Sequence, residues 1–143
     1  MPNQTSRNAT LPDAITKPSA WLGTDMARNP AAWIYKLSVN DVRDLEAAAT
    51  HFQSLGVDVG EISEETFPLT TFGEHISKLK QTLLSGVGLE VLCGLPIENY
   101  SQAFVATIFC GIGAHIGSAR SQNAEGHILG HVRDIGADAN DPN

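Results

Sequence analysis

The sequence is poor in basic residues: nine Lys and Arg stand against sixteen Asp and Glu, and the formal net charge is −7. The nine basic residues are scattered, whereas a surface that binds nucleic acid or an anionic membrane needs clustered Lys and Arg. We therefore expect neither nucleic acid nor a membrane as a partner. No run approaches the roughly 18 consecutive apolar residues of a membrane-spanning helix. The first twenty residues also lack the apolar segment of a signal peptide.

Cysteine is scarce as well. Cys93 and Cys110 are the only two cysteines, which is too few for a disulfide framework. Each lies in an apolar segment, where a small buried hydrophobic side chain is expected. Neither has a basic neighbour in the sequence that would activate a nucleophilic thiolate. This cysteine usage favours an intracellular protein, and we expect a cytoplasmic one.

Regular structure is expected only after a polar N-terminal segment. Residues 1–20 are rich in Asn, Thr, Ser and Pro, and we predict that they form a disordered tail because they offer little surface to bury. A loop is expected between Trp21 and Trp33. The remaining length, up to residue 143, fits one domain.

Apolar periodicity predicts an α+β arrangement in that domain. Period-3.6 patterns indicate helices at 39–55, 72–84 and 101–114, and short apolar runs between glycines indicate strands at 89–93 and 127–135. The pairs Ser38 with Asp41 and Thr71 with Glu74 have the spacing of capping boxes at two helix starts. Gly117 is placed to end the third helix. The part of this helix from residue 103 to residue 110 is apolar nearly all round, which indicates burial on several sides.

Glycines at 111, 113 and 117 raise the possibility of a nucleotide loop. A dinucleotide fingerprint has G-x-G-x-x-G at the start of a helix. Here the last spacing is one residue too long, and the glycines follow a helix rather than precede it. A helix end that packs tightly against its neighbours is the structural alternative.

The histidines do not form an obvious metal site. His127 and His131 would lie about 13 Å apart on a strand, too far to share one ion, although either could point into a pocket. His75 is expected at the surface or its boundary, and His115 is expected to cap the end of its helix. None of the five histidines begins a His-x-Asp or His-x-Glu sequence.

An ordered set of short segments nevertheless suggests a family. Trp33 and Leu37 are followed by DVRDLEAAA (41–49), FPL (67–69), GLEVLCGLP (88–96), GAHIG (113–117), SQN (121–123) and GHILGHVRD (126–134). This order resembles the N-terminal part of fungal-type members of the taurine-dioxygenase-like (TauD/TfdA) family of iron(II)- and 2-oxoglutarate-dependent oxygenases. The resemblance covers most of the chain outside the tail.

The resemblance implies a fold and a chemistry. It implies the helical layer and first strands of a double-stranded β-helix (jelly-roll) fold, here incomplete, so that residues 21–143 would form a partial domain. It also implies iron(II), held by two His and one carboxylate with open positions for 2-oxoglutarate and oxygen. The family's His-x-Asp pair and 2-oxoglutarate-binding Arg have no matching positions here. We therefore expect a chain truncated before its metal motif, which binds no iron tightly and has no catalytic residues of its own.

The one part of the family's active site with matching positions in this chain is the approach to the substrate pocket. In the family, the polar loop after the glycine-rich turn and the strand that follows it help to line that pocket. The corresponding candidates are Ser121, Gln122, Asn123, His131 and Arg133, for which loop hydrogen bonding or a solvent-exposed strand position is the alternative role. The expected function is that of an oxygenase fragment whose full-length form acts on a small molecule. A non-enzymatic α+β interaction module and a small nucleotide-binding domain are the alternatives, and no oligomeric state is indicated.

Overall fold

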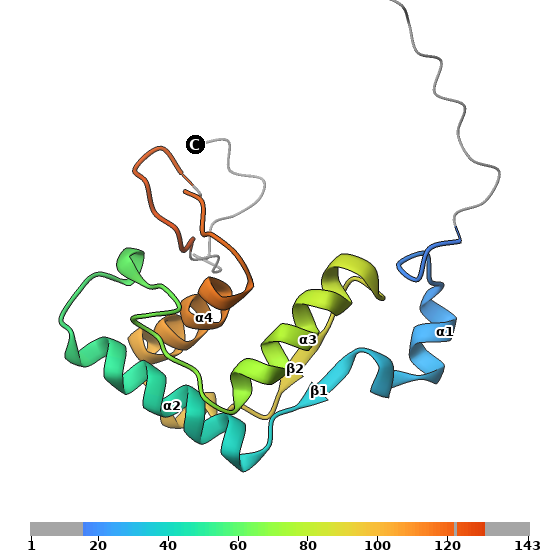
Figure 1. The fold of residues 1–143 in the computed structure, drawn as a ribbon, viewed down its shortest axis with the longest axis horizontal. Coiled ribbons are helices and arrows are strands. Elements are labelled where there is room, and N and C mark those ends of the chain that lie inside the picture. Colours follow the sequence, from blue (N-terminus) through green and yellow to red (C-terminus); the bar gives the residue numbers. More distant parts are fainter. Residues whose placement is uncertain (1–15, 122, 131–143) are drawn as a thin grey trace, which may run out of the picture.

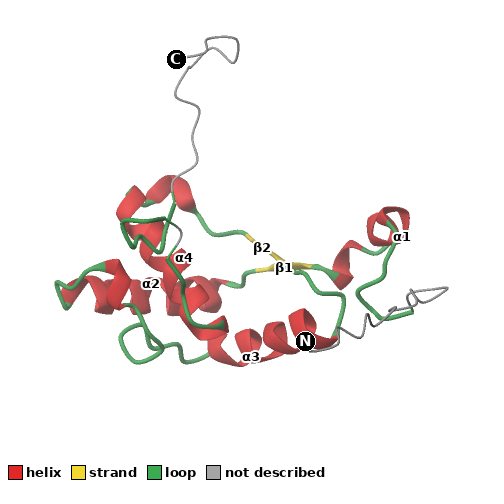
Figure 2. Ribbon diagram, turned by 90° about the horizontal axis from the view of Figure 1, so that it is seen from above, coloured by secondary structure: helices red, strands yellow, loops and turns green. Residues whose placement is uncertain are grey.

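The computed structural model describes residues 16–121 and 123–130, which form a helix-rich α+β arrangement (Figure 1). The helices and strands, in chain order, are α1 (Gly23–Arg28), β1 (Ile34–Lys36), α2 (Val39–Ser54), α3 (Phe72–Ser85), β2 (Val91–Cys93) and α4 (Gln102–Ile116). Single 3₁₀ turns lie at Pro30–Ala32, Val59–Glu61 and Ile97–Asn99. Figure 2 shows the small sheet between α1 at one end and α2 with α4 at the other.

The sheet is a parallel pair in which Ile34, Tyr35 and Lys36 face Val91, Leu92 and Cys93 in turn. The chain passes from β1 to β2 through α2 and α3. Helix α3 covers one face, because the ring of Tyr35 stacks on that of His75 with centroids 3.5 Å apart. The other face carries Ile34 and Val91, which are 37% and 45% exposed. Two parallel strands are compatible with an incomplete α+β domain, and the jelly roll stays a prediction.

The core lies where α2, α3 and α4 meet. Leu45 and Phe52 of α2, Phe72 and Ile76 of α3, and Ile108 of α4 are almost fully buried there. Phe67, from the segment before α3, is also fully buried. The buried apolar residues of α2 and α3 recur three or four positions apart, as the apolar stripes of their sequences predict: Leu45, Ala48, Ala49 and Phe52 in α2, and Phe72, Ile76 and Leu79 in α3.

The three long helices confirm the sequence prediction to within two residues at each end. Helix α2 begins at a capping box, in which Ser38 Oγ accepts from Asp41 N at 3.2 Å and Asp41 Oδ2 accepts from Ser38 N at 2.7 Å. Gly117 is the C-cap of α4. The strand predicted at 89–93 is confirmed over Val91–Cys93, which form β2.

The prediction of a capping box at Thr71 and Glu74 is wrong. Thr71 has helical backbone angles, φ −84° and ψ −41°, and its side chain does not cap the helix. The carboxylate of Asp44, in the middle of α2, accepts hydrogen bonds from Phe72 N at 2.8 Å and from Thr70 N at 3.0 Å. The start of α3 is therefore capped from another helix, which local spacing cannot reveal.

Two further corrections concern short segments. The expected loop between Trp21 and Trp33 contains α1 and a 3₁₀ turn, and two indole groups anchor this segment: Trp21 Nε1 donates to Val87 O, and Trp33 Nε1 donates to Met26 O, both at 2.9 Å.

The expected strand at 127–135 is absent from its described part, residues 127–130. The backbone N–H of His127 donates to Asn123 Oδ1 at 3.0 Å and is therefore not free for a strand ladder. The rest of that strand lies outside the described residues, as do residues 1–15 of the predicted tail. Strand β1 was not predicted.

A hydrogen bond from Tyr100 to Glu46 ties the segment before α4 to α2. Tyr100 Oη donates to Glu46 Oε1 at 2.6 Å, across 54 residues of sequence. Burial, and then the bond to Glu46, raise the pKa of Tyr100 to about 12. The phenol therefore stays protonated, and continues to donate, well above neutral pH.

Tyr100→Phe is expected to lower the free energy of unfolding by about 1–2 kcal/mol at pH 7, since it removes a hydrogen bond to a charged acceptor. Because the pKa of Tyr100 is raised in the folded chain, this stabilisation is complete below the ordinary value of 10.0 and is lost as the pH rises through about 12. Urea unfolding of both proteins between pH 7 and 12 measures the difference, which should shrink at the alkaline end. Equal stability at pH 7 would contradict the prediction.

Candidate functional site

The loop that follows α4 is organised around Asn123. Asn123 Oδ1 accepts from the backbone N–H of His127, so its amide nitrogen faces the His127 ring and donates to Nδ1 at 2.8 Å. The proton of a neutral His127 ring therefore lies on Nε2. Ser121 Oγ donates to the carbonyl of Asn123 at 2.6 Å. Gly126, with φ +88°, makes the turn between these groups.

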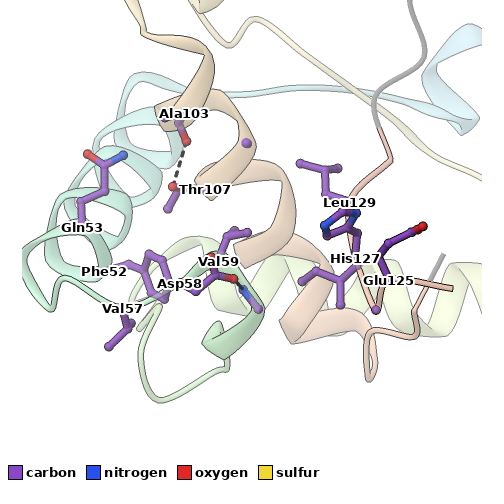
Figure 3. Close-up of a pocket in the computed structure, with 14 residues that line it drawn as sticks. Phe52, Gln53, Val57, Asp58, Val59, Ala103, Thr107, Glu125, His127 and Leu129 are labelled. Carbon is purple, nitrogen blue, oxygen red and sulfur yellow. Dashed lines mark hydrogen bonds between the residues drawn. The ribbon is translucent and has the colours of Figure 1, made fainter. Parts of the chain in front are cut away.

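This loop forms one side of a pocket of about 590 Å³ (Figure 3). The floor is apolar and consists of Phe52 from α2 and of Ala103, Ala106 and Thr107 from α4. Figure 3 shows residues 125–129 of the loop on the opposite side from Phe52, Val57 and Asp58. Thr107 Oγ1 donates to the Ala103 carbonyl at 2.9 Å, so its hydroxyl bonds within the helix.

Polar groups lie at the margin of the pocket. These are Gln53, Asp58, Glu125 and His127. Asp58 Oδ1 accepts from Gly60 N at 2.8 Å, which fixes the carboxylate and starts the 3₁₀ turn at Val59–Glu61. An apolar floor with a few polar groups at its edge is typical of sites for small molecules.

A second, larger cavity of about 1220 Å³ follows the other side of α4. We call it the α4 groove. Its apolar walls come from α4 (Val105, Phe109, Ile112 and Ile116), from β2 and the residues after it (Leu92 and Leu95), and from Ile62. Gly60 and Ile128 line both cavities, so the two cavities adjoin at these residues. Cys110 also lines the groove, and burial raises the pKa of its thiol, which disfavours the nucleophilic thiolate.

The structure describes two of the five residues predicted for the substrate pocket. Ser121 and Asn123 lie together in the loop and bond within it, and neither lines the two cavities. Gln122, His131 and Arg133 lie outside the described residues. His127 does line the smaller pocket, although not from a strand. Sequence reasoning missed Gln53, Asp58 and Glu125, and the Asp58-x-Gly60 turn was the one signal available for Asp58.

His75 and His115 have partners away from the two cavities. His75 Nε2 lies 2.6 Å from Glu90 Oε1, with both side chains only 15% exposed. His75 is therefore a boundary residue, as predicted. His115 Nε2 lies 2.7 Å from the Phe67 carbonyl, so His115 holds the segment before α3 instead of capping its own helix.

Iron would need two His and one carboxylate converging on one point. Within residues 16–121 and 123–130, no three His, Cys, Asp or Glu side chains lie close enough together to hold a metal ion. The described residues therefore do not fit the metal that the family resemblance implies.

The glycine cluster is not arranged as a phosphate loop. Gly111 and Gly113 lie inside α4, whose N-cap, Ser101, is ten residues before Gly111. A phosphate loop uses the free N–H groups at a helix N-terminus, whereas these glycines lie in its C-terminal half. An added Cβ at Gly111 would lie 2.5 Å from the Phe67 ring, whereas at Gly113 it would meet nothing within 4 Å. Close packing therefore explains Gly111, as the structural alternative predicted.

No helix in the part of the chain that the structure describes combines the length and apolar character needed to cross a bilayer. The chain matches no family model.

The chain is similar to two curated proteins over most of its own length. The taurine hydroxylase-like protein SAT17 of Stachybotrys chartarum is 34% identical over 116 residues, which cover 80% of this chain and 30% of that protein. The FR-33289 synthase of Streptomyces rubellomurinus is 26% identical over 126 residues, which cover 88% of this chain and 37% of the synthase. The chain thus spans about a third of the length of these relatives.

Proposed function

We propose that this chain is the N-terminal part of a TauD-like, iron(II)- and 2-oxoglutarate-dependent oxygenase that oxidises a small molecule. The observation that carries the proposal is the 34% identity to the taurine hydroxylase-like protein over 80% of the chain. The helical layer beside a small sheet is compatible with such a segment, and the jelly roll is part of the proposal.

Within that oxygenase, the segment would contribute to the substrate pocket through the loop that follows α4. Asn123 holds the loop and orients His127, whose Nε2–H has no partner among the described residues and would donate to an oxygen of a bound molecule. Ser121, Gln122, His131 and Arg133 remain candidates for the same pocket. The apolar floor formed by α2 and α4 would accept an apolar part of the substrate.

The chain by itself is expected to bind no iron tightly and to turn over no 2-oxoglutarate. The reason is the absence of any His-x-Asp or His-x-Glu in its sequence, together with the positions of the described histidines, each of which has a protein partner or lies apart from the others. The test adds iron(II) and 2-oxoglutarate to the purified chain and follows succinate, with an iron-free sample as the control. Iron-dependent release above that control would refute the prediction.

The family proposal itself is tested on the gene. A longer transcript that joins this sequence to a downstream His-x-Asp, and then to an Arg for 2-oxoglutarate, would support it. A longer product that turns over no 2-oxoglutarate in the presence of iron(II) would contradict it.

A non-enzymatic interaction module is the second candidate, because the chain exposes the apolar α4 groove. The isolated chain of such a module should be monodisperse and should unfold in one cooperative transition. A segment of a larger oxygenase should show a broad transition and bind an apolar dye.

A further inference from the structure

The smaller pocket has acidic groups on both of its sides. Asp58 lies on the same side as Phe52 and Val57, and Glu125 belongs to the loop on the opposite side (Figure 3). No Lys or Arg lines the pocket in the part of the chain that the structure describes. A cleft whose charged groups share one sign attracts a ligand of the opposite sign. The lining therefore favours a cation over an anion.

Both carboxylates keep oxygen atoms for a ligand. Asp58 Oδ1 accepts from Gly60 N at 2.8 Å, whereas Asp58 Oδ2 has no hydrogen-bond partner among the described residues. The bond to Gly60 holds the carboxylate in one orientation, so that less conformational entropy is lost when a ligand binds. Glu125 makes neither a hydrogen bond nor an ion pair within residues 16–121 and 123–130. Each carboxylate can thus accept from an N–H donor of a bound molecule.

The rest of the lining limits the kind of cation. A metal ion is disfavoured, because no three His, Cys, Asp or Glu side chains of the described residues could hold one together. Phe52 supplies the one benzene ring among the described lining residues, whereas a quaternary ammonium is typically recognised by a cage of aromatic faces. A primary ammonium fits better, since its three N–H groups donate to carboxylate oxygens. The apolar floor of Phe52, Ala103 and Ala106 would contact a hydrocarbon part of the same molecule.

We propose that the smaller pocket binds a primary amine with an apolar body, and that the substrate of the oxygenase belongs to this class of molecule. The statement about the substrate rests on the proposed function. The ammonium group donates to Asp58 Oδ2, the carboxylate that Gly60 holds in place, and Glu125 adds a second negative charge. The Nε2–H of His127 is left for a neutral oxygen, such as a hydroxyl, on the same molecule. A sulfonate or phosphate group, in contrast, would bring its negative charge beside two carboxylates.

The experiment titrates the full, isotope-labelled chain at pH 7 and constant salt with four probes that share a hexyl chain and differ in the head group. These are hexylamine, hexanol, hexanesulfonate and hexyltrimethylammonium. The backbone N–H signals of Gly60 and His127 in NMR spectra report both the place of binding and the affinity. Asp58→Asn removes one negative charge but keeps an oxygen that can accept from Gly60 N. Glu61→Gln is the matched control, because it removes one charge from the same 3₁₀ turn without lining either cavity.

Hexylamine is expected to shift both signals and to bind about fivefold more tightly than hexanol, the upper end for a solvent-exposed ion pair. Hexanesulfonate should bind more weakly than hexanol. Asp58→Asn should remove most of the preference for the amine over the alcohol, whereas Glu61→Gln should keep it. Shifts at neither Gly60 nor His127, equal affinity for amine and alcohol, or tighter binding of the sulfonate than of the amine would overturn the proposal.

Two further outcomes separate this proposal from simpler ones. Equal loss with Asp58→Asn and Glu61→Gln would overturn it in favour of general attraction to an acidic chain, and equal binding of hexyltrimethylammonium and hexylamine would overturn the assignment of a primary amine. The probes report binding alone, so they do not depend on turnover. The expected order of affinities, together with a longer product that releases no succinate, would contradict the proposed function and support the ligand class of the pocket.

Discussion

Gly111→Ala is expected to lower the stability of the fold by about 2–3 kcal/mol, because an added methyl group in a packed core forces its neighbours to move. The new Cβ would lie 2.5–2.6 Å from three atoms of the Phe67 ring, a separation at which something must shift. Phe67 cannot retreat easily, because its side chain is fully buried and its carbonyl is held by His115. The gain in helix propensity from Gly to Ala, about 1 kcal/mol, offsets only part of this cost.

Gly113→Ala is the matched control. It lies two residues further along the same helix, and its added Cβ would meet nothing within 4 Å. It should therefore raise the stability by up to about 1 kcal/mol through helix propensity alone. Urea midpoints followed by circular dichroism measure both effects. The prediction is contradicted if the two substitutions change the midpoint in the same direction.

The sequence predicts the long helices well because their signals are local. The apolar stripe of α2 and the Ser38–Asp41 box both lie within the helix and the residue before it. The same local reasoning placed Gly117 at the end of α4. The close packing at Gly111 was also predictable, because a glycine beside an apolar helical run often marks a close approach between neighbouring elements.

The features that sequence reasoning missed depend on residues far apart in the chain. Asp44 caps α3 across 26 to 28 residues, and β1 exists only because β2 lies beside it, so neither has a local signal. In the described part of the strand predicted after residue 126, residues 127–130, Asn123 binds the His127 N–H, an interaction that the alternating pattern of Ile128 and its neighbours does not reveal. The smaller pocket was missed in part, because Asp58 and Glu125 face it from segments 67 residues apart.

Substitution of Asp44 is expected to cause the second large loss of stability. Its carboxylate accepts from Thr70 N and Oγ1 and from Phe72 N, at 2.6–3.1 Å, and more weakly from Thr71 Oγ1 at 3.4 Å. Asp44→Ala leaves the buried N–H of Phe72 and the part-buried donors of Thr70 without an acceptor. It also removes a negative charge from a helix N-terminus, and we expect a loss of about 3 kcal/mol. Asp44→Asn keeps one acceptor and should cost about half as much.

Thr71→Ala tests whether α3 is capped by Asp44 or by the Thr71 side chain, as local spacing suggests. Because the Thr71 side chain does not cap α3, its removal should change the stability by about 0.5 kcal/mol or less, as for most surface substitutions. Urea midpoints at pH 7 measure all three variants. A loss with Thr71→Ala as large as that with Asp44→Ala would restore the local capping box and contradict the structure.

The effect of Asp44 should also depend on pH. Burial by itself would raise the pKa of Asp44, but the hydrogen bonds from Thr70, Phe72 and Thr71 outweigh burial and hold the pKa below its ordinary value of 3.8. The stabilisation is therefore complete above that value and is lost as the pH falls through the lower, folded-state pKa. The difference in stability between the unaltered chain and Asp44→Asn should stay constant from pH 7 to about pH 5 and shrink in more acidic solution. A difference that instead grows on acidification would show that the carboxylate is not the acceptor that holds the start of α3.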